Sequence, residues 1–163
     1  MRTDSIMPNQ IDALATALRA IVGPGHVLTA DADTARYTAD WRRNFPGVAR
    51  AVVRPANTQE VSRVVELCAA QRVAVVPQGG NTGLVGGSTP DASGREVVLS
   101  LDRMTAVRRV DMLDNSITLE AGCTVLAAQQ AASGAGRLFA LSLASEGSLS
   151  LIHISEPTRP ERI

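Results

Sequence analysis

The residues best suited to chemistry form a glycine-rich run from Pro77 to Gly87, which reads Pro-Gln-Gly-Gly-Asn-Thr-Gly-Leu-Val-Gly-Gly. The run follows the apolar stretch 73–76, so a buried strand is expected to end where the glycines begin. Successive backbone N–H groups that no side chain covers can form a concave nest for an anion. The sequence therefore predicts a phosphate-binding loop, and a pyrophosphate suits it better than a hydrophobic ligand does.

Two other kinds of glycine-rich phosphate site have different spacings. A Walker loop needs Lys followed by Ser or Thr after its last glycine, whereas Gly87 is followed directly by Ser88. A Rossmann fingerprint leads straight into a helix, whereas residues 89–94 are typical of a turn. A flexible linker stays as the alternative to a binding loop, although polar residues such as Gln78 and Asn81 are unusual in a linker.

Hydrophobic periodicity predicts the elements that position this run. Apolar residues at helical spacing indicate helices, and short valine-rich or alternating runs between turn residues indicate strands. Helices are expected from Ile11 to Val22, from Gln59 to Gln71 after a cap at Asn57 or Thr58, and from Val125 to Ser133, and strands at Val48–Val53, Val73–Val76, Glu96–Leu101, Arg108–Asp111 and Ser116–Ala121.

The order of these elements predicts an α+β fold with two lobes. A strand, a helix and a strand between residues 48 and 76 imply a parallel pair joined by a right-handed crossover. The last two strands flank the turn 113–115 and indicate a hairpin, which would begin a second, mainly antiparallel lobe. The helix expected from Gln59 to Gln71 has an apolar stripe, which is expected to face the core. Its members are Val61, Val64, Val65, Leu67 and Cys68.

Five short segments carry a resemblance to a known family. They are Val52-Val53-Arg54-Pro55, Thr58-Gln59-Glu60-Val61, the run Pro77–Gly87, Val98-Leu99-Ser100-Leu101 with Met104, and Leu119-Glu120-Ala121-Gly122. Together they resemble the FAD-binding domain of the vanillyl-alcohol oxidase (PCMH) type over about Tyr37 to Ser148. Within that type, the sequence is most similar to the D-2-hydroxyacid dehydrogenases, which act on 2-hydroxyglutarate, lactate or glycolate.

The resemblance implies where FAD would be bound. The glycine-rich run would wrap the pyrophosphate, and a second segment that begins at Leu141 would pass close to the flavin ring, although relatives usually carry Pro where this chain has Ala140. The implied cofactor-binding residues are Pro77, Gln78, Gly79, Gly80, Asn81, Thr82, Gly83, Gly86, Gly87, Ser88, Leu141, Ser142, Gly147 and Ser148. Some members attach FAD through a His in the glycine-rich run. None is present here, so non-covalent FAD is expected.

The resemblance also implies a reaction. Members of the family transfer a hydride from C2 of a 2-hydroxy acid to flavin N5, and a separate acceptor then reoxidises the FAD. Their substrate and metal ligands lie in a C-terminal domain, so no catalytic or metal-binding residue is predicted in this sequence. An oxidase that returns electrons to oxygen, and a non-catalytic module that binds a phosphate or dinucleotide ligand, stay as alternatives.

Three segments are expected along the chain. Residues 1–45 would form the N-terminal helix and a lead-in, residues 46–148 an incomplete FAD-binding domain, and residues 149–163 a non-native tail, because that string resembles a translated sequencing adaptor joined to a truncated read. In the lead-in, Asp40 and Trp41 match a stretch that the family often has near the flavin site. A solvated loop with one partly buried Trp is the alternative interpretation.

Composition excludes several classes of function. The 163 residues carry a formal net charge of zero, so no basic field is available to bind nucleic acid. The two cysteines, Cys68 and Cys123, are too few for a disulfide framework, and Cys68 is interpreted as a small buried hydrophobe. No signal peptide or membrane span is recognisable, and the cytoplasm is the expected compartment. The expected partners are a small 2-hydroxy acid and an electron acceptor.

Overall fold

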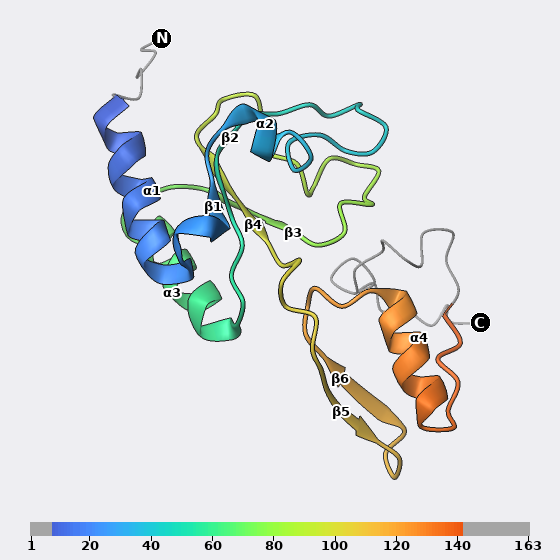
Figure 1. The fold of residues 1–163 in the computed structure, drawn as a ribbon. Coiled ribbons are helices and arrows are strands. Elements are labelled where there is room, and N and C mark those ends of the chain that lie inside the picture. The colour runs from blue at the N-terminus through green and yellow to red at the C-terminus, as the bar shows by residue number, and fades with distance from the viewer. Residues whose placement is uncertain (1–7, 142–163) are drawn as a thin grey trace, which may run out of the picture.

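The computed structural model describes residues 8–141, with side chains from residue 13, as two lobes joined end to end (Figure 1). The first lobe holds a four-stranded sheet, and the second holds a two-stranded sheet and one helix. Strand β4 (Glu96–Ser100) is the last element of the first lobe, and the chain then runs directly into the hairpin of the second. This arrangement confirms the predicted α+β fold class.

The sheet of the first lobe has the strand order β1-β2-β4-β3. β2 (Ala49–Val53) and β3 (Val75–Gln78) both run parallel to β4, and β1 (Val27–Leu28) pairs antiparallel with β2. The expected parallel pair is therefore parallel but not adjacent, because β4 lies between its two strands. The burial of β4 explains its central position. Val97 and Val98 of β4 have no exposed surface, and a central strand is covered on both faces.

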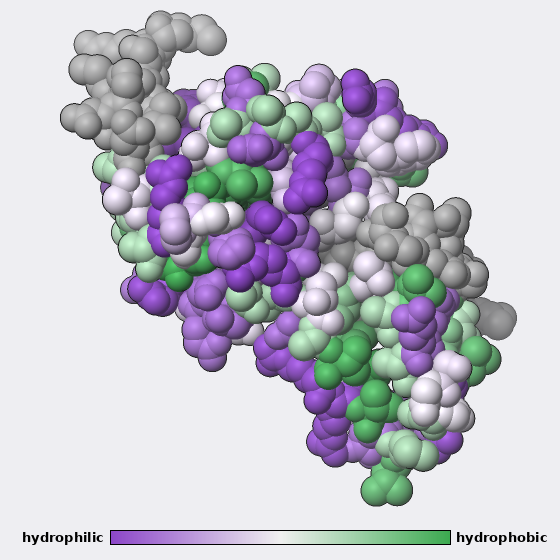
Figure 2. All heavy atoms as spheres, viewed as in Figure 1, coloured by the Kyte–Doolittle hydropathy of each residue, from purple (hydrophilic) through white to green (hydrophobic). Residues whose placement is uncertain are grey.

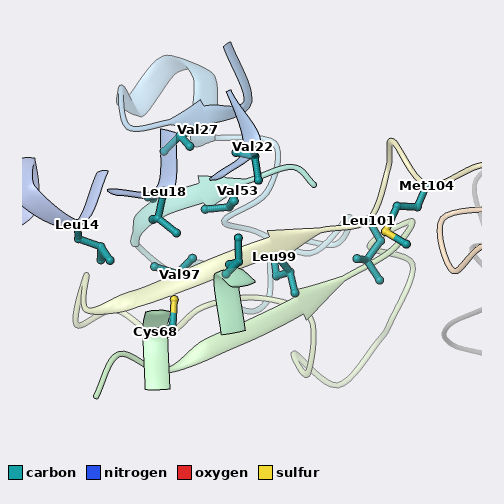
Figure 3. Close-up of a cluster of buried hydrophobic side chains, with 12 residues drawn as sticks. Leu14, Leu18, Val22, Val27, Val53, Cys68, Val97, Leu99, Leu101 and Met104 are labelled. Carbon is teal, nitrogen blue, oxygen red and sulfur yellow. The ribbon is translucent and has the colours of Figure 1, made fainter. Parts of the chain in front are cut away.

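One face of this sheet is covered by two helices, α1 (Pro8–Val22) and α3 (Thr58–Ala70). Figure 3 shows Leu14 and Leu18 of α1 and Cys68 of α3 directed toward the strands. Each fully buried aliphatic side chain stabilises the fold by about 1.5–3 kcal/mol. Cys68 is fully buried, as predicted, whereas the expected stripe residue Val65 is 44% exposed because it lies on the outer side of α3.

The start of α3 is fixed by a reciprocal capping arrangement. The Asn57 side chain accepts a hydrogen bond from the Glu60 backbone N–H at 2.9 Å, and the Glu60 carboxylate accepts one from the Ala56 N–H at 2.7 Å. Both bonds satisfy donors that a helix start would otherwise leave unpaired. The predicted cap at Asn57 is confirmed.

The other face of the sheet is covered by the chain that leads into β2. Here Tyr37, Val52 and Val98 form a second buried cluster. The lead-in includes a 3-10 turn (Pro24–His26) and the short helix α2 (Asp31–Thr34), which periodicity did not predict. Such short elements carry too few residues for a periodic signal.

The second lobe begins with the predicted hairpin, in which β5 (Val107–Asp111) pairs antiparallel with β6 (Ser116–Leu119). The last element of this lobe within the described residues is α4 (Val125–Gly134), whose cap is the Thr124 side chain. Figure 2 shows apolar residues gathered on the surface of this lobe. Five large apolar side chains there are exposed, namely Val107, Met112, Leu113, Leu126 and Leu138.

A close backbone approach fixes the junction of the lobes. The Gly122 N–H donates to the Met104 carbonyl at 2.8 Å, and a Cβ added at Gly122 would lie 1.9 Å from the Leu101 carbonyl oxygen. Only glycine fits such a contact. The glycine of the segment 119–122 is therefore required by packing between the lobes.

Candidate cofactor site

The glycine-rich loop, defined here as residues 77–88, leaves the sheet at the carboxyl end of β3. Its first turn is held by Gln78, which is only 1% exposed and whose carbonyl accepts a hydrogen bond from the Leu101 N–H at 2.9 Å. Parallel sheets place their ligand sites beyond the carboxyl ends of the strands. The loop therefore lies at the edge of the sheet where a ligand site is expected.

Three side chains of the loop bond to the protein itself. Gln78 Nε2 donates to the Tyr37 carbonyl at 2.9 Å and to the Ser88 carbonyl at 2.7 Å. Asn81 Nδ2 donates to the Ala39 carbonyl at 2.8 Å, and Asn81 Oδ1 accepts from Ser88 Oγ at 2.8 Å. These bonds close the loop on itself and hold it against residues 37–39 of the lead-in.

Two loop residues have positive φ angles, Asn81 at 53° and Gly86 at 75°. Asparagine tolerates this region better than most residues do. Gly86 is also restricted by space, since a Cβ there would lie 2.9 Å from the Phe45 ring. Gly86 therefore packs beneath the Phe45 ring, a contact that the sequence did not predict.

The backbone amides of the loop remain available for a ligand. No described residue accepts a hydrogen bond from the N–H groups of residues 79–88. The Thr82 hydroxyl is buried and likewise has no partner within the described chain. Folded proteins rarely leave such groups unpaired, and a ligand is one of the usual partners. This donor set fits an anion, as the spacing of the glycines predicts.

A family model described as an FAD binding domain matches residues 49–152, more than half of the chain. The chain belongs to this FAD-binding domain family. It is 36% identical over 132 residues to the mitochondrial D-2-hydroxyglutarate dehydrogenase of Bos taurus, a match that covers 81% of this chain and 24% of the bovine protein. The chain thus spans about a quarter of the length of that curated relative.

Solved structures of low sequence identity share the fold. Alkyldihydroxyacetonephosphate synthase is 20% identical, with a TM-score of 0.77, over 93% of this chain and 29% of that one. The 4-ethylphenol oxidase from Gulosibacter chungangensis is 22% identical, with a TM-score of 0.68, over 82% of this chain and 26% of that one. The predicted FAD-binding domain of the PCMH type is confirmed, and FAD is the cofactor of such domains.

An open hollow of about 610 Å³ lies beside the glycine-rich loop of this FAD-binding domain. Phe45 and Val76 line it, and three of the predicted site residues do so as well, namely Pro77, Gly86 and Gly87. The loop thus combines unpaired amides, which run from residue 79 to residue 88, with residues that wall a hollow of mixed polarity.

The predicted ring-side segment is only partly described. Leu141 belongs to the second lobe, where its carbonyl accepts a hydrogen bond from Gln129 Nε2 at 2.8 Å. Within the described residues, no hydrogen bond joins Leu141 to the glycine-rich loop. The other three predicted residues of this segment, Ser142, Gly147 and Ser148, lie outside the described part of the chain.

The stretch around Asp40 and Trp41 is divided between core and solvent. Asp40 is 2% exposed, and its Oδ1 accepts a hydrogen bond from the Phe45 N–H at 2.9 Å. Trp41 is 65% exposed, and the Arg42 guanidinium lies 5.1 Å from its ring centroid. The stretch is therefore a solvated loop, as the alternative interpretation expects, although Trp41 is more exposed than that interpretation assumes. The Asp40 side chain braces the lead-in.

Neither cysteine in the described chain is activated. Burial raises the pKa of the Cys68 thiol, and burial is also the main cause of the raised pKa of Cys123. A raised pKa keeps a thiol protonated and poorly nucleophilic. No cluster of three metal-binding side chains occurs within residues 8–141. No helix in that same part is long and apolar enough to cross a membrane.

Proposed function

We propose that this chain is the N-terminal part of a flavoenzyme that oxidises a D-2-hydroxy acid to the corresponding 2-oxo acid. D-2-hydroxyglutarate, D-lactate and glycolate are the proposed substrates, and a separate electron acceptor is proposed. An oxidase that returns electrons to oxygen stays as the alternative. The observation that carries the proposal is the set of unpaired backbone amides on a rigidly held loop, within an FAD-binding domain whose bovine relative is named as a D-2-hydroxyglutarate dehydrogenase.

In this proposal the loop binds the pyrophosphate of FAD through main-chain groups. The N–H groups between Gly79 and Gly83 would donate to the phosphate oxygens, and the Thr82 hydroxyl would add a side-chain donor. Backbone donors bind an anion at little reorganisation cost when the loop is already ordered. When bound, FAD would supply the acceptor for the hydride of the substrate, which carries both electrons of the oxidation.

The proposed attachment of FAD is non-covalent, because the loop contains no His. The proposed compartment is the cytoplasm, although the bovine relative is named as mitochondrial. We also propose that residues 149–163 are non-native. Sequencing of the source locus tests this assignment, since a continuous genomic reading frame through these residues would refute it.

The main test is FAD binding by the complete protein encoded at that locus. Flavin fluorescence titration and the absorbance spectrum should show binding, and acid precipitation should leave the washed pellet colourless. The variant Gly83→Val should abolish binding, because its side chain covers the amides, while an added Cβ at Gly83 lies 3.8 Å from Ser88 Oγ and fits the fold.

The matched control is Gly25→Val, which lies outside the loop and has open space around its added Cβ. It should bind FAD like the wild type. A colourless protein that ignores added FAD would refute the flavoenzyme, and the non-catalytic phosphate-binding module would then take its place. Unchanged FAD affinity in Gly83→Val would refute the role of the loop.

A further inference from the structure

The side chains of Gln78, Asn81 and Ser88 share one property that separates them from the other predicted cofactor contacts. These side chains form four hydrogen bonds of 2.7–2.9 Å to other groups of the protein. Gln78 and Ser88 are also buried, at 1% and 4% exposure. These side-chain atoms have little freedom left to bind a cofactor.

The acceptors of two of these bonds are far away in sequence. Gln78 reaches Tyr37 across 41 residues, and Asn81 reaches Ala39 across 42 residues. Tyr37 is itself held in place, since its ring packs with Val52 and Val98 in the second core cluster. Residues 37–39 therefore provide a fixed support that joins the glycine-rich loop to the sheet.

The chemistry of the amide side chains suits this task. Gln78 Nε2 has two N–H groups and gives one to each of two carbonyl oxygens, which the ionised carboxylate of a glutamate could not do. Asn81 donates through Nδ2 and accepts through Oδ1, so it links the support to Ser88. A carboxylate at either position would face a carbonyl oxygen without a proton to share.

We propose that Gln78, Asn81 and Ser88 are positioning residues, which hold the backbone amides of the loop in the FAD-binding conformation before the cofactor arrives. The inference rests on the proposed function and deepens it. A glycine-rich loop has a large conformational entropy to lose. If these bonds order the loop before FAD binds, the conformational entropy of the loop is lost during folding and not on binding. FAD affinity then depends on side chains that do not touch FAD.

The test uses the complete protein and two single variants, Asn81→Gly and Ser88→Ala. Asn81→Gly keeps a residue that accepts a positive φ but removes both side-chain bonds, and Ser88→Ala removes one bond. We expect FAD affinity to fall about fivefold in Ser88→Ala, which loses one bond, and about 25-fold in Asn81→Gly, which loses two.

The decisive readout is the double variant Asn81→Gly/Ser88→Ala. Because Ser88 acts through Asn81 Oδ1, its removal should cost less than a further twofold once Asn81 is absent. The control is Leu84→Ala, a half-exposed side chain of the same loop that makes no described hydrogen bond, and its FAD affinity should stay within twofold of the wild type. Urea midpoints identify any variant with a general folding defect.

The outcomes separate the two proposals. If the wild type binds FAD but both single variants bind within twofold of it, the positioning role is wrong while the proposed function stands. Fully additive losses in the double variant would also refute it, because they would mean independent contacts. If Asn81→Gly does not fold, unchanged affinity in Ser88→Ala alone is sufficient to reject the role. A wild type that binds no FAD overturns both proposals.

Discussion

At the scale of single residues, the glycine-rich loop combines uncovered backbone amides with side chains that form hydrogen bonds to residues 37–39 of the lead-in. Glycine spacing indicated uncovered amides, and the structure has them between residues 79 and 88. The hydrogen bonds of Gln78 and Asn81 to Tyr37 and Ala39 were beyond prediction, because they join segments about 40 residues apart and leave no periodic signal. The positive φ of Asn81 was equally unpredictable from spacing alone.

Gly86 offers a test of the loop conformation in which backbone and packing act together. Gly86→Ala should lower the free energy of unfolding by about 1–2 kcal/mol for the positive φ alone, and by more because the new Cβ meets the Phe45 ring. Urea unfolding measures the change. Gly87→Ala is the matched control, with open space around its Cβ, and should stay within about 0.5 kcal/mol of the wild type. Equal effects of the two substitutions would contradict the described loop.

At the scale of elements, periodic segments were predicted well and short or long-range features were not. Helix α3 and the hairpin lie within a few residues of their expected bounds, because each has an uninterrupted pattern and a recognisable cap or turn. The strand order was not predictable, since the position of β4 between β2 and β3 depends on contacts between distant segments. The two-residue strand β1 is too short to give a pattern.

The base of the hairpin should respond to acid through Glu120. Its carboxylate accepts hydrogen bonds from the Ala106 N–H and from Arg108, each at 3.0 Å, and these lower its pKa. A carboxylate whose pKa is lower in the folded state stabilises the fold above its unfolded pKa, near 4.3, and loses that contribution as the pH falls through the folded value. The hydrogen-exchange protection factors of the β5 and β6 amides, which are corrected for the intrinsic exchange rate at each pH, should therefore fall severalfold below about pH 4.

The variant Glu120→Gln isolates this effect. It should lower the hydrogen-exchange protection of the β5 and β6 amides at neutral pH. It should also make that protection less dependent on pH, because the glutamine side chain carries no ionisable group. Glu66→Gln, on the exposed side of α3, is the control and should keep the pH dependence of the wild type. The same acid response in Glu120→Gln and the wild type would rule out this role for Glu120.

At the scale of the whole molecule, the two lobes differ in how fully they are packed. The first lobe buries a continuous core between α1, α3 and the sheet. The second lobe, as far as it is described, has a two-stranded sheet and one helix, with Leu113 at 94% and Leu138 at 87% exposure. A two-stranded sheet is only marginally stable without further strands or helices against it. The family resemblance leads us to expect that the second lobe is incomplete in this sequence, and that expectation stays a prediction.

The last prediction concerns the 163-residue chain expressed as given. We expect it to show no oxidation of D-2-hydroxyglutarate, D-lactate or glycolate in a dye-reduction assay with added FAD, and to bind FAD weakly or not at all. Hydride transfer requires the substrate to be held about 3–3.5 Å from the flavin. The chain spans only 24% of its bovine relative, and the family resemblance implies that the substrate ligands lie in a C-terminal domain. The complete protein is the positive control. Turnover of any of the three acids by the 163-residue chain above the no-enzyme rate would refute the prediction that this chain alone is inactive.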